Sequence, residues 1–188
     1  MPVPYWRLSA FYLFFFATLG ALLPYWSIYL RALGHSPGEI GSLMAIIAAT
    51  KIVAPNLWGW VADRRGERMP VVRFGAGLAF VLFLGVFLGQ GFWWLAATMA
   101  LFSFFWNAAL PQFEANTFNW LGGERSRYSR VRLWGSVGFI LTSAALGPVL
   151  DVTGVLALPW FVAALYLGLW AVSLAAPGAP GHGAHADP

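Results

Sequence analysis

The chain has 188 residues, of which 60% are hydrophobic and only 10% are charged. About a quarter of the residues of a soluble domain are charged, so this composition excludes an ordinary soluble protein and, with its long apolar runs, places the chain in a lipid bilayer. The absence of cysteine excludes a disulfide framework and cysteine-ligated metal sites. The net charge of +4 does not indicate nucleic-acid binding, because nine of the ten arginines gather at alternate ends of the apolar runs.

Six apolar segments follow one another, each long enough to cross the bilayer as a helix. The first is too long for the core of a cleavable signal peptide and has no small-residue cleavage site, so we expect it to be retained. The expected spans are 6–31, 37–62, 70–90, 93–121, 129–150 and 155–176. The sequence predicts an all-α membrane domain over residues 1–176 and a flexible cytoplasmic linker over residues 177–188. His182 and His185 fit a disordered tail better than a metal site.

The connection between the first two spans contains residues typical of the end of one helix and of the beginning of the next. Gly34 suits a left-handed C-terminal cap, and Pro37 suits the first position of a helix. Ser36 and Glu39 have the spacing of a reciprocal capping box. The chain is therefore expected to reverse sharply between the first two spans.

The distribution of arginine predicts the orientation of the spans. Arg31 alone falls on one side of the membrane, and the other nine fall on the opposite side: Arg7, Arg64, Arg65, Arg68, Arg73, Arg125, Arg127, Arg130 and Arg132. Positive residues concentrate on the cytoplasmic side of membrane proteins. Both termini are therefore expected in the cytoplasm, with the chain in a bacterial inner membrane.

Charged residues also sort the spans. The third and sixth spans have no ionisable residue in their interiors and can face lipid, whereas the second, fourth and fifth contain Lys51, Glu114 and Arg132 and are expected to face inward. A short repeat, Ala21–Pro24 and Ala108–Pro111, lies in spans that run in opposite directions. Inverted repeats with proline-interrupted helices are typical of transporters. We therefore expect two inverted three-helix repeats.

Glu114 and Arg132 each lie nine residues from Gly123, so a helical hairpin would bring both to a similar depth, roughly 13 Å into a hydrocarbon core about 30 Å thick. Charges at such a depth usually face a cavity and have a function, although the pair could only fasten two helices. Asn107 lies two turns before Glu114 on the same helix face. Lys51 is too deep to snorkel and is either a cation for an anionic substrate or a partner for a carboxylate. These four residues are the candidate substrate site.

Residues Gly59–Arg68 resemble the signature loop of the major facilitator superfamily, G-x-x-x-D-[RK]-x-G-x-[RK], and lie between the second and third spans, as in that family. Gly59 is expected to permit a close helix approach and Gly66 a tight reversal of the chain. Glu67 departs from the basic residue often found there. The resemblance implies a role in conformational switching for Gly59, Asp63, Arg64, Gly66 and Arg68.

The stretches 111–115 and 128–138 are similar to the branch that contains the lactose permease and the nucleoside and phenylpropionate proton symporters. In the lactose permease, an acid and an arginine that match Glu114 and Arg132 bind sugar, and its Asn-Ala matches Asn107-Ala108, but Phe139 replaces the tryptophan that stacks on the sugar. The resemblance implies one six-helix half of a twelve-helix fold, whose second half would carry the proton-coupling residues. It implies a transporter rather than an enzyme, with a small-molecule substrate, protons and the bilayer as partners and without cofactor or metal.

The substrate class and two other functions remain open at this point. Lys51 and Arg132 against Glu114 favour a small organic anion such as an aromatic carboxylate, and a sugar or nucleoside is the alternative. Tyr25, Trp26 and Tyr29 are either stacking groups or interfacial aromatics. An intramembrane protease at Ser136 is disfavoured because no span contains a histidine base. A membrane assembly protein without transport activity is the alternative of another class.

Overall fold

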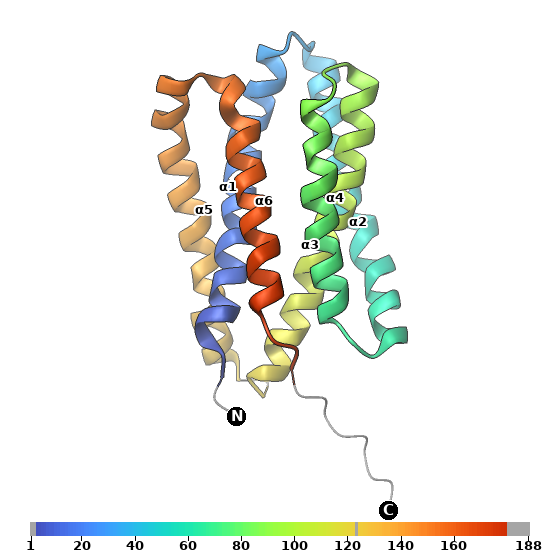
Figure 1. The fold of residues 1–188 in the computed structure, drawn as a ribbon, viewed down its shortest axis with the longest axis vertical. Helices are drawn as coiled ribbons and strands as arrows, with labels where there is room; N and C mark the ends of the chain where they lie inside the picture. Colours follow the sequence, from blue (N-terminus) through green and yellow to red (C-terminus); the bar gives the residue numbers. More distant parts are fainter. Residues whose placement is uncertain (1–2, 123, 180–188) are drawn as a thin grey trace, which may run out of the picture.

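The computed structural model describes residues 3–122 and 124–179, and all six expected spans are helical in it. The long helices are α1 (Tyr5–Ala32), α2 (Pro37–Arg65), α3 (Met69–Phe83), α4 (Phe92–Trp120), α5 (Arg125–Thr153) and α6 (Leu158–Ala175), with short 3-10 turns η1 (Leu84–Phe87) and η2 (Val155–Ala157). They form an upright bundle, and the first and last described residues lie at the same end (Figure 1). This end carries most of the arginines, and we call it the arginine-rich end.

Several expected boundaries differ from the observed ones by three or four residues. The second span was expected to end at 62 and the fifth at 150, but α2 continues to Arg65 and α5 to Thr153. The third span was expected to continue to residue 90, but α3 passes into the 3-10 turn η1 and ends at Phe87. Glycines at positions 85, 89 and 91 favour such an early end, because glycine stabilises a helix poorly. The fifth helix begins at Arg125 rather than at 129, because its polar first turn is helical although it is not apolar. Hydropathy detects the apolar part of a helix that lies in the membrane core, but not the polar turns at the ends of the helix.

The first connection forms as the sequence predicts. The backbone N–H of Glu39 donates to Ser36 Oγ at 3.4 Å, and the backbone N–H of Ser36 donates to Glu39 Oε2 at 2.8 Å. Gly34 has φ +92° and allows the chain to leave α1. This reciprocal cap satisfies backbone donors that would otherwise be unpaired at the start of α2.

The packing has the symmetry of two inverted three-helix repeats, α1–α3 and α4–α6. The first helix of each unit packs into the other unit: α1 lies against α5 and α6, and α4 lies against α2 and α3, while α3 and α6 contact each other. Exchanging the two units maps the α1–α5 pair onto α4–α2 and the α1–α6 pair onto α4–α3, and leaves the α3–α6 pair in place. Helix-interior prolines follow the same symmetry, at Pro24 and Pro111 in the first helices and Pro55 and Pro148 in the second.

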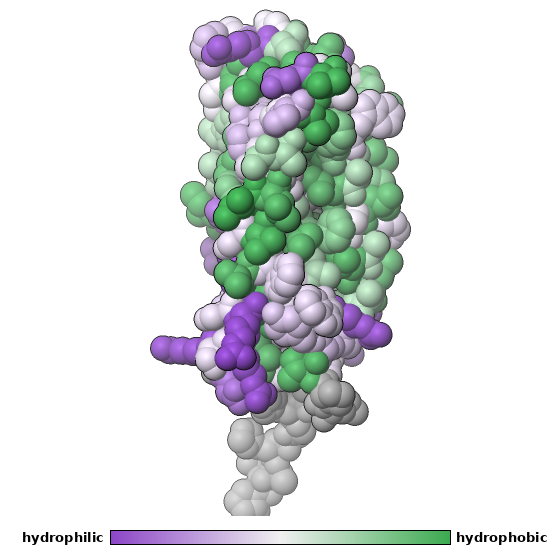
Figure 2. Space-filling model, turned by 90° about the vertical axis from the view of Figure 1, so that its left-hand side faces the viewer, coloured by the Kyte–Doolittle hydropathy of each residue, from purple (hydrophilic) through white to green (hydrophobic). Residues whose placement is uncertain are grey.

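The helices expected to be inward-facing are not equally buried. The centre of the bundle is formed by α1 and α4, whereas α2 and α5 are its least buried helices and lie at its edges. The outward faces of α3 and α6 carry exposed apolar residues such as Phe74, Val81 and Leu167, as expected for contact with lipid. Figure 2 shows the α5 side of the molecule, where hydrophobic residues fill the middle and hydrophilic ones gather at the two ends. The chain is a multi-pass membrane protein.

The tightest helix crossing is that of α1 and α5. A side chain at Gly138 would collide with the backbone of Leu13, and one at Gly20 would lie 2.6 Å from the carbonyl oxygen of Phe139. Glycine is required at such crossings because the two backbones touch without intervening side chains. This contact brings Arg132 on α5 close to the aromatic side chains of α1.

Candidate functional site

A cavity of about 470 Å³ lies between α1, α2, α4 and α5 and contains three of the four residues predicted to bind substrate. Lys51 from α2, Asn107 from α4 and Arg132 from α5 all line it. The remaining wall is almost entirely apolar: Phe15, Phe16, Leu19, Leu22, Leu23, Met44, Ile47, Ala48, Pro55, Trp106, Leu110 and Pro111. Two of the helix-interior prolines, Pro55 and Pro111, therefore face the cavity.

Glu114, the fourth predicted residue, contacts Arg132 beside the cavity without lining it. Its Oε1 lies 3.5 Å from Arg132 Nε, and both side chains are about one-third exposed (34% and 30%). The guanidinium makes no hydrogen bond to the described residues, so the ion pair is loose and the donors of Arg132 remain available to a ligand. The structure thus brings Glu114 and Arg132 together as the hairpin argument expects.

Tyr128 on α5 contacts Glu114 on α4, and it was not predicted from the sequence as a site residue. Its hydroxyl donates to Glu114 Oε1 at 3.2 Å, and its ring stacks on Phe118 with centroids 4.3 Å apart. Tyr128 precedes Arg132 by one helical turn, and Phe118 follows Glu114 by one turn. The ion pair and the stacked rings are therefore two neighbouring contacts between α4 and α5. The four-residue spacing from Arg132 was the available signal for Tyr128.

Phe16 on α1 supports the guanidinium of Arg132 and was also missed. The Arg132 Cζ lies 3.9 Å from the centroid of the Phe16 ring and 5.5 Å from that of Tyr12. A cation over an aromatic face is stabilised by the negative potential of the ring. Gly135 leaves space for this arrangement, because a Cβ atom there would lie 2.7 Å from Phe16 and 2.9 Å from Arg132 Nη1.

Lys51 is an exposed cation at the mouth of the cavity. Within the residues that the structure describes, no carboxylate lies within ion-pair distance of it. The described residues therefore contain no carboxylate that could be the structural partner of Lys51. Lys51 and Arg132 supply two positive charges against the one carboxylate of Glu114.

The aromatic residues near the end of α1 do not line the cavity. Trp26 is fully buried and its Nε1 donates to Met99 Sδ at 3.4 Å, and Tyr29 packs beside it in the core. Tyr25 donates from its hydroxyl to the Ser143 carbonyl at 2.6 Å and fastens α1 to α5. The aromatic wall of the cavity is formed instead by Phe15 and Trp106, whose rings stack with centroids 5.0 Å apart.

The predicted switching residues lie together at the arginine-rich end, but only some contact one another. Arg68 Nη2 donates to Asp63 Oδ1 at 3.0 Å, and Arg68 Nη1 donates to Gln112 Oε1 on α4 at 2.9 Å. Arg64 instead lies over the Trp60 ring, with Cζ 3.9 Å from its centroid. The α2–α3 loop is therefore tied to α4 one half-turn before Glu114.

The two glycines of the signature segment differ in their roles. Gly66 has φ +69° and makes the tight reversal after α2 that the sequence predicts. Gly59 was expected to permit a close helix approach, but a Cβ atom there would meet only the Gln112 side chain at 3.7 Å, an ordinary contact. In this conformation no close approach requires a glycine at position 59.

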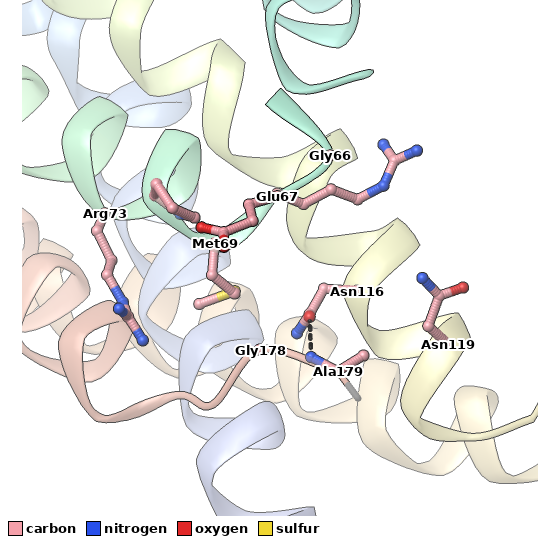
Figure 3. Close-up of a pocket in the computed structure, with 10 residues that line it drawn as sticks. Gly66, Glu67, Met69, Arg73, Asn116, Asn119, Gly178 and Ala179 are labelled. Carbon is pink, nitrogen blue, oxygen red and sulfur yellow. Dashed lines mark hydrogen bonds between the residues drawn. The ribbon is translucent and has the colours of Figure 1, made fainter. Parts of the chain in front are cut away.

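A second cavity, of about 800 Å³, opens at the arginine-rich end between the α2–α3 loop, α4 and the segment after α6. Asn116, almost fully buried, accepts from the backbone N–H of Ala179 at 2.7 Å (Figure 3) and donates to the Pro177 carbonyl at 3.2 Å. Trp120 Nε1 donates to the same carbonyl. The first three residues of the predicted linker are thus held against α4, and residues 180–188, with His182 and His185, lie outside the described residues.

Comparisons with known proteins agree with this fold and give its family. The model of the MFS_1 like family matches residues 5–186. A probable 3-phenylpropionic acid transporter of Escherichia coli is 28% identical over 76% of this chain, and a maltose permease of Geobacillus stearothermophilus is 30% identical over 75%. These matches cover 37% and 36% of the two relatives.

A solved structure has the same fold. The nucleoside transporter NupG superposes with a TM-score of 0.82 at 19% identity, over 96% of this chain and 45% of NupG. The chain therefore spans less than half the length of the proteins that it matches. Its six helices, their packing and the family match together establish that the chain belongs to the major facilitator superfamily of membrane transporters, which are not enzymes.

Proposed function

We propose that this chain is the N-terminal half of a proton-coupled secondary active transporter that takes up a small organic anion, with an aromatic carboxylate favoured. The cavity lined by Lys51, Asn107 and Arg132 is its part of the substrate site. The observation that carries the proposal is Arg132, whose guanidinium is held over Phe16 in the cavity wall and makes no hydrogen bond to the described residues. A guanidinium can grip a carboxylate through two parallel hydrogen bonds.

The charge balance supports an anion over a neutral solute. Lys51 and Arg132 outweigh Glu114. Once a second half of the fold closes the cavity, its apolar wall would keep water away and so strengthen the attraction of a bound anion. Phe15, Phe16 and Trp106 place aromatic rings in the cavity wall, against which an aromatic ring can pack. The relative that is a probable 3-phenylpropionic acid transporter supports this choice, whereas the maltose and nucleoside relatives keep a neutral sugar or nucleoside as the alternative.

The second half of the fold would cover α2 and α5. Both edge helices expose large apolar side chains, among them Ile52 and Val53 on α2 and Leu133, Ile140 and Leu141 on α5. A second six-helix unit on this face would close the cavity from the other side, and alternating access would follow from rocking of the two halves. The length of the relatives supports this assembly, and the proton-coupling groups are assigned to that second half.

The signature loop is proposed to govern switching rather than recognition. It lies at the arginine-rich end, outside the cavity, and the Asp63–Arg68–Gln112 contacts join it to α4. We assign Gly59, Arg64 and Gly66 to the same loop by family position. The arginine-rich end is assigned to the cytoplasm of a bacterium, where residues 177–188 would begin the connection to the second half.

Uptake measurements on the complete transporter test this proposal. Cells expressing it are offered a labelled arylalkanoate, a nucleoside and a disaccharide. Arg132→Lys and Lys51→Gln should each reduce carboxylate uptake at least about tenfold, since the first loses the two-pronged grip of the guanidinium and the second loses a positive charge. Glu114→Gln should reduce uptake as well, because Arg132 loses the carboxylate that contacts its guanidinium at 3.5 Å and helps to position it. Arg125→Lys, an exposed arginine outside the cavity, is the matched control and should transport normally.

Two outcomes would contradict the proposal. Transport of a neutral sugar or nucleoside that is indifferent to Lys51→Gln would replace the anion by the alternative substrate class. Absence of any uptake, with normal membrane expression, would favour a membrane assembly protein.

A further inference from the structure

A row of polar side chains runs from the cavity wall into the α2–α4 contact. Asn107 Nδ2 donates to Thr50 Oγ1 at 3.1 Å, Thr50 Oγ1 lies 2.8 Å from Ser103 Oγ, and Ser103 Oγ donates to the Met99 carbonyl at 2.6 Å. Ser103 and Asn107 lie on one face of α4, one turn apart. Only Asn107 of this row lines the cavity.

The direction of the protons in this row follows from the Met99 carbonyl, which can only accept. Ser103 has a single hydroxyl proton and donates it to Met99, and Thr50 donates its own single proton either to Ser103 Oγ or to the Ile47 carbonyl, which lies 2.9 Å away. Thr50 can then only accept from Asn107, which it does from the amide N–H₂. If the amide were turned over, Thr50 would have to donate to its oxygen, and the row would have one hydrogen bond fewer.

The amide oxygen of Asn107 is therefore the end left for the cavity. Within the described residues, Asn107 Oδ1 accepts no hydrogen bond. It is also not one of the side-chain atoms that are buried away from solvent without a hydrogen-bond partner. The cavity thus combines two cations, one fixed acceptor and the second N–H of the same amide in an otherwise apolar wall. A ligand that covers this oxygen without donating to it leaves an acceptor unpaired, which weakens binding.

We infer that the substrate carries, besides its acidic group, an O–H or N–H donor that is received by Asn107 Oδ1. A hydroxylated aromatic acid has this chemistry. This inference rests on the proposed anion transport and narrows its substrate class. Thr50 and Ser103 act as positioning residues, because they orient the amide without touching the ligand.

The inference is tested by competition binding to the complete transporter with three sets of acids. These are 3-phenylpropionate, its three hydroxyphenyl isomers and the corresponding methoxyphenyl isomers. At least one hydroxyphenyl isomer should bind about tenfold more tightly than both 3-phenylpropionate and its own methoxy counterpart, because the methoxy group has no proton to donate.

Variants of Thr50 test the origin of this preference. Thr50→Val removes the acceptor that fixes the amide, so the ratio of hydroxyl to methoxy affinity should fall to about threefold or less. Thr50→Ser keeps the hydroxyl and should restore the ratio. Thr18→Val is the matched control: Thr18 is buried and donates to the Phe14 carbonyl at 2.9 Å away from the cavity, so its loss should leave the ratio unchanged.

The outcomes separate this inference from the proposed function. Equal affinity for all three sets of acids, or an unchanged ratio in Thr50→Val, would overturn the inference while anion transport stands. Failure of every acid to bind would overturn the proposed function, and the inference with it.

Discussion

Gly135 determines where the guanidinium of Arg132 can lie. A methyl group at this position would collide with Nη1 at the tip of Arg132 and with Cδ2 of the Phe16 ring, both of them side-chain atoms and not backbone. Gly135→Ala should therefore weaken binding of the acid about tenfold, because Arg132 loses its position over Phe16, while the protein keeps its thermal stability in detergent. Binding and melting of the purified complete transporter measure the two effects.

Gly138→Ala provides the contrasting control one turn along the same helix. Its methyl group would meet the backbone of Leu13, which cannot swing away, so this variant should lose stability or expression rather than affinity alone. Unchanged binding by a stable Gly135→Ala protein would show that the position of Arg132 over Phe16 does not matter for the ligand.

The charged pair could be predicted from the sequence, but its aromatic support could not. Glu114 and Arg132 flank a single turn, so counting residues from that turn was sufficient to align them. Phe16 reaches Arg132 only because α1 crosses α5, where contacting residues such as Gly20 and Ser143 are 123 positions apart. No local pattern specifies which distant helices cross, so Phe16 and Gly135 became visible only in the folded bundle.

At the scale of the helices, the hydrophobic pattern predicted where the spans lie but not which helices are buried. A span that contains a charge was expected to be inside, yet α2 and α5 are edge helices and their charges face a cavity that is open on one side. A charge in a span indicates that its surface does not face lipid, and we propose that a second half of the transporter covers this surface. Symmetry of the packed pairs, which hydropathy does not reveal, places α1 and α4 in the centre.

The contact between the α2–α3 loop and α4 predicts how a substitution of Asp63 affects binding and uptake. Asp63→Asn removes the negative charge that Arg68 contacts at 3.0 Å, and Arg68 would keep only Gln112. Because this contact is about half exposed and far from the cavity, equilibrium binding of the acid should change less than about threefold while uptake slows. Glu67→Gln is the control, since the Glu67 side chain is exposed and makes no ion pair within the described chain.

Binding and transport rates must be measured separately for this variant. A large loss of affinity in Asp63→Asn with an unchanged rate of uptake would move Asp63 from switching to recognition.

At the scale of the whole molecule, six helices place both described ends of the chain on one side of the membrane. The same side carries the α2–α3 and α4–α5 connections with their arginines, whereas Arg31 lies in the last turn of α1, at the opposite end. Positively charged residues tend to stay on the cytoplasmic side when a membrane protein inserts. Nine arginines on one side against one on the other therefore strongly favour one orientation. The arginine-rich end should therefore be cytoplasmic.

Single cysteines test this orientation directly, because the chain has no cysteine of its own. Glu124→Cys lies in the exposed α4–α5 connection and Gln90→Cys lies in the exposed turn before α4, at the opposite end. Neither position has a positive φ, so a cysteine side chain is tolerated at both. A membrane-impermeant maleimide should label Gln90→Cys in intact cells and Glu124→Cys only after the membrane is opened. Labelling of Glu124→Cys from outside, with Gln90→Cys protected, would invert the topology and with it the assignment of the signature loop to the cytoplasmic face.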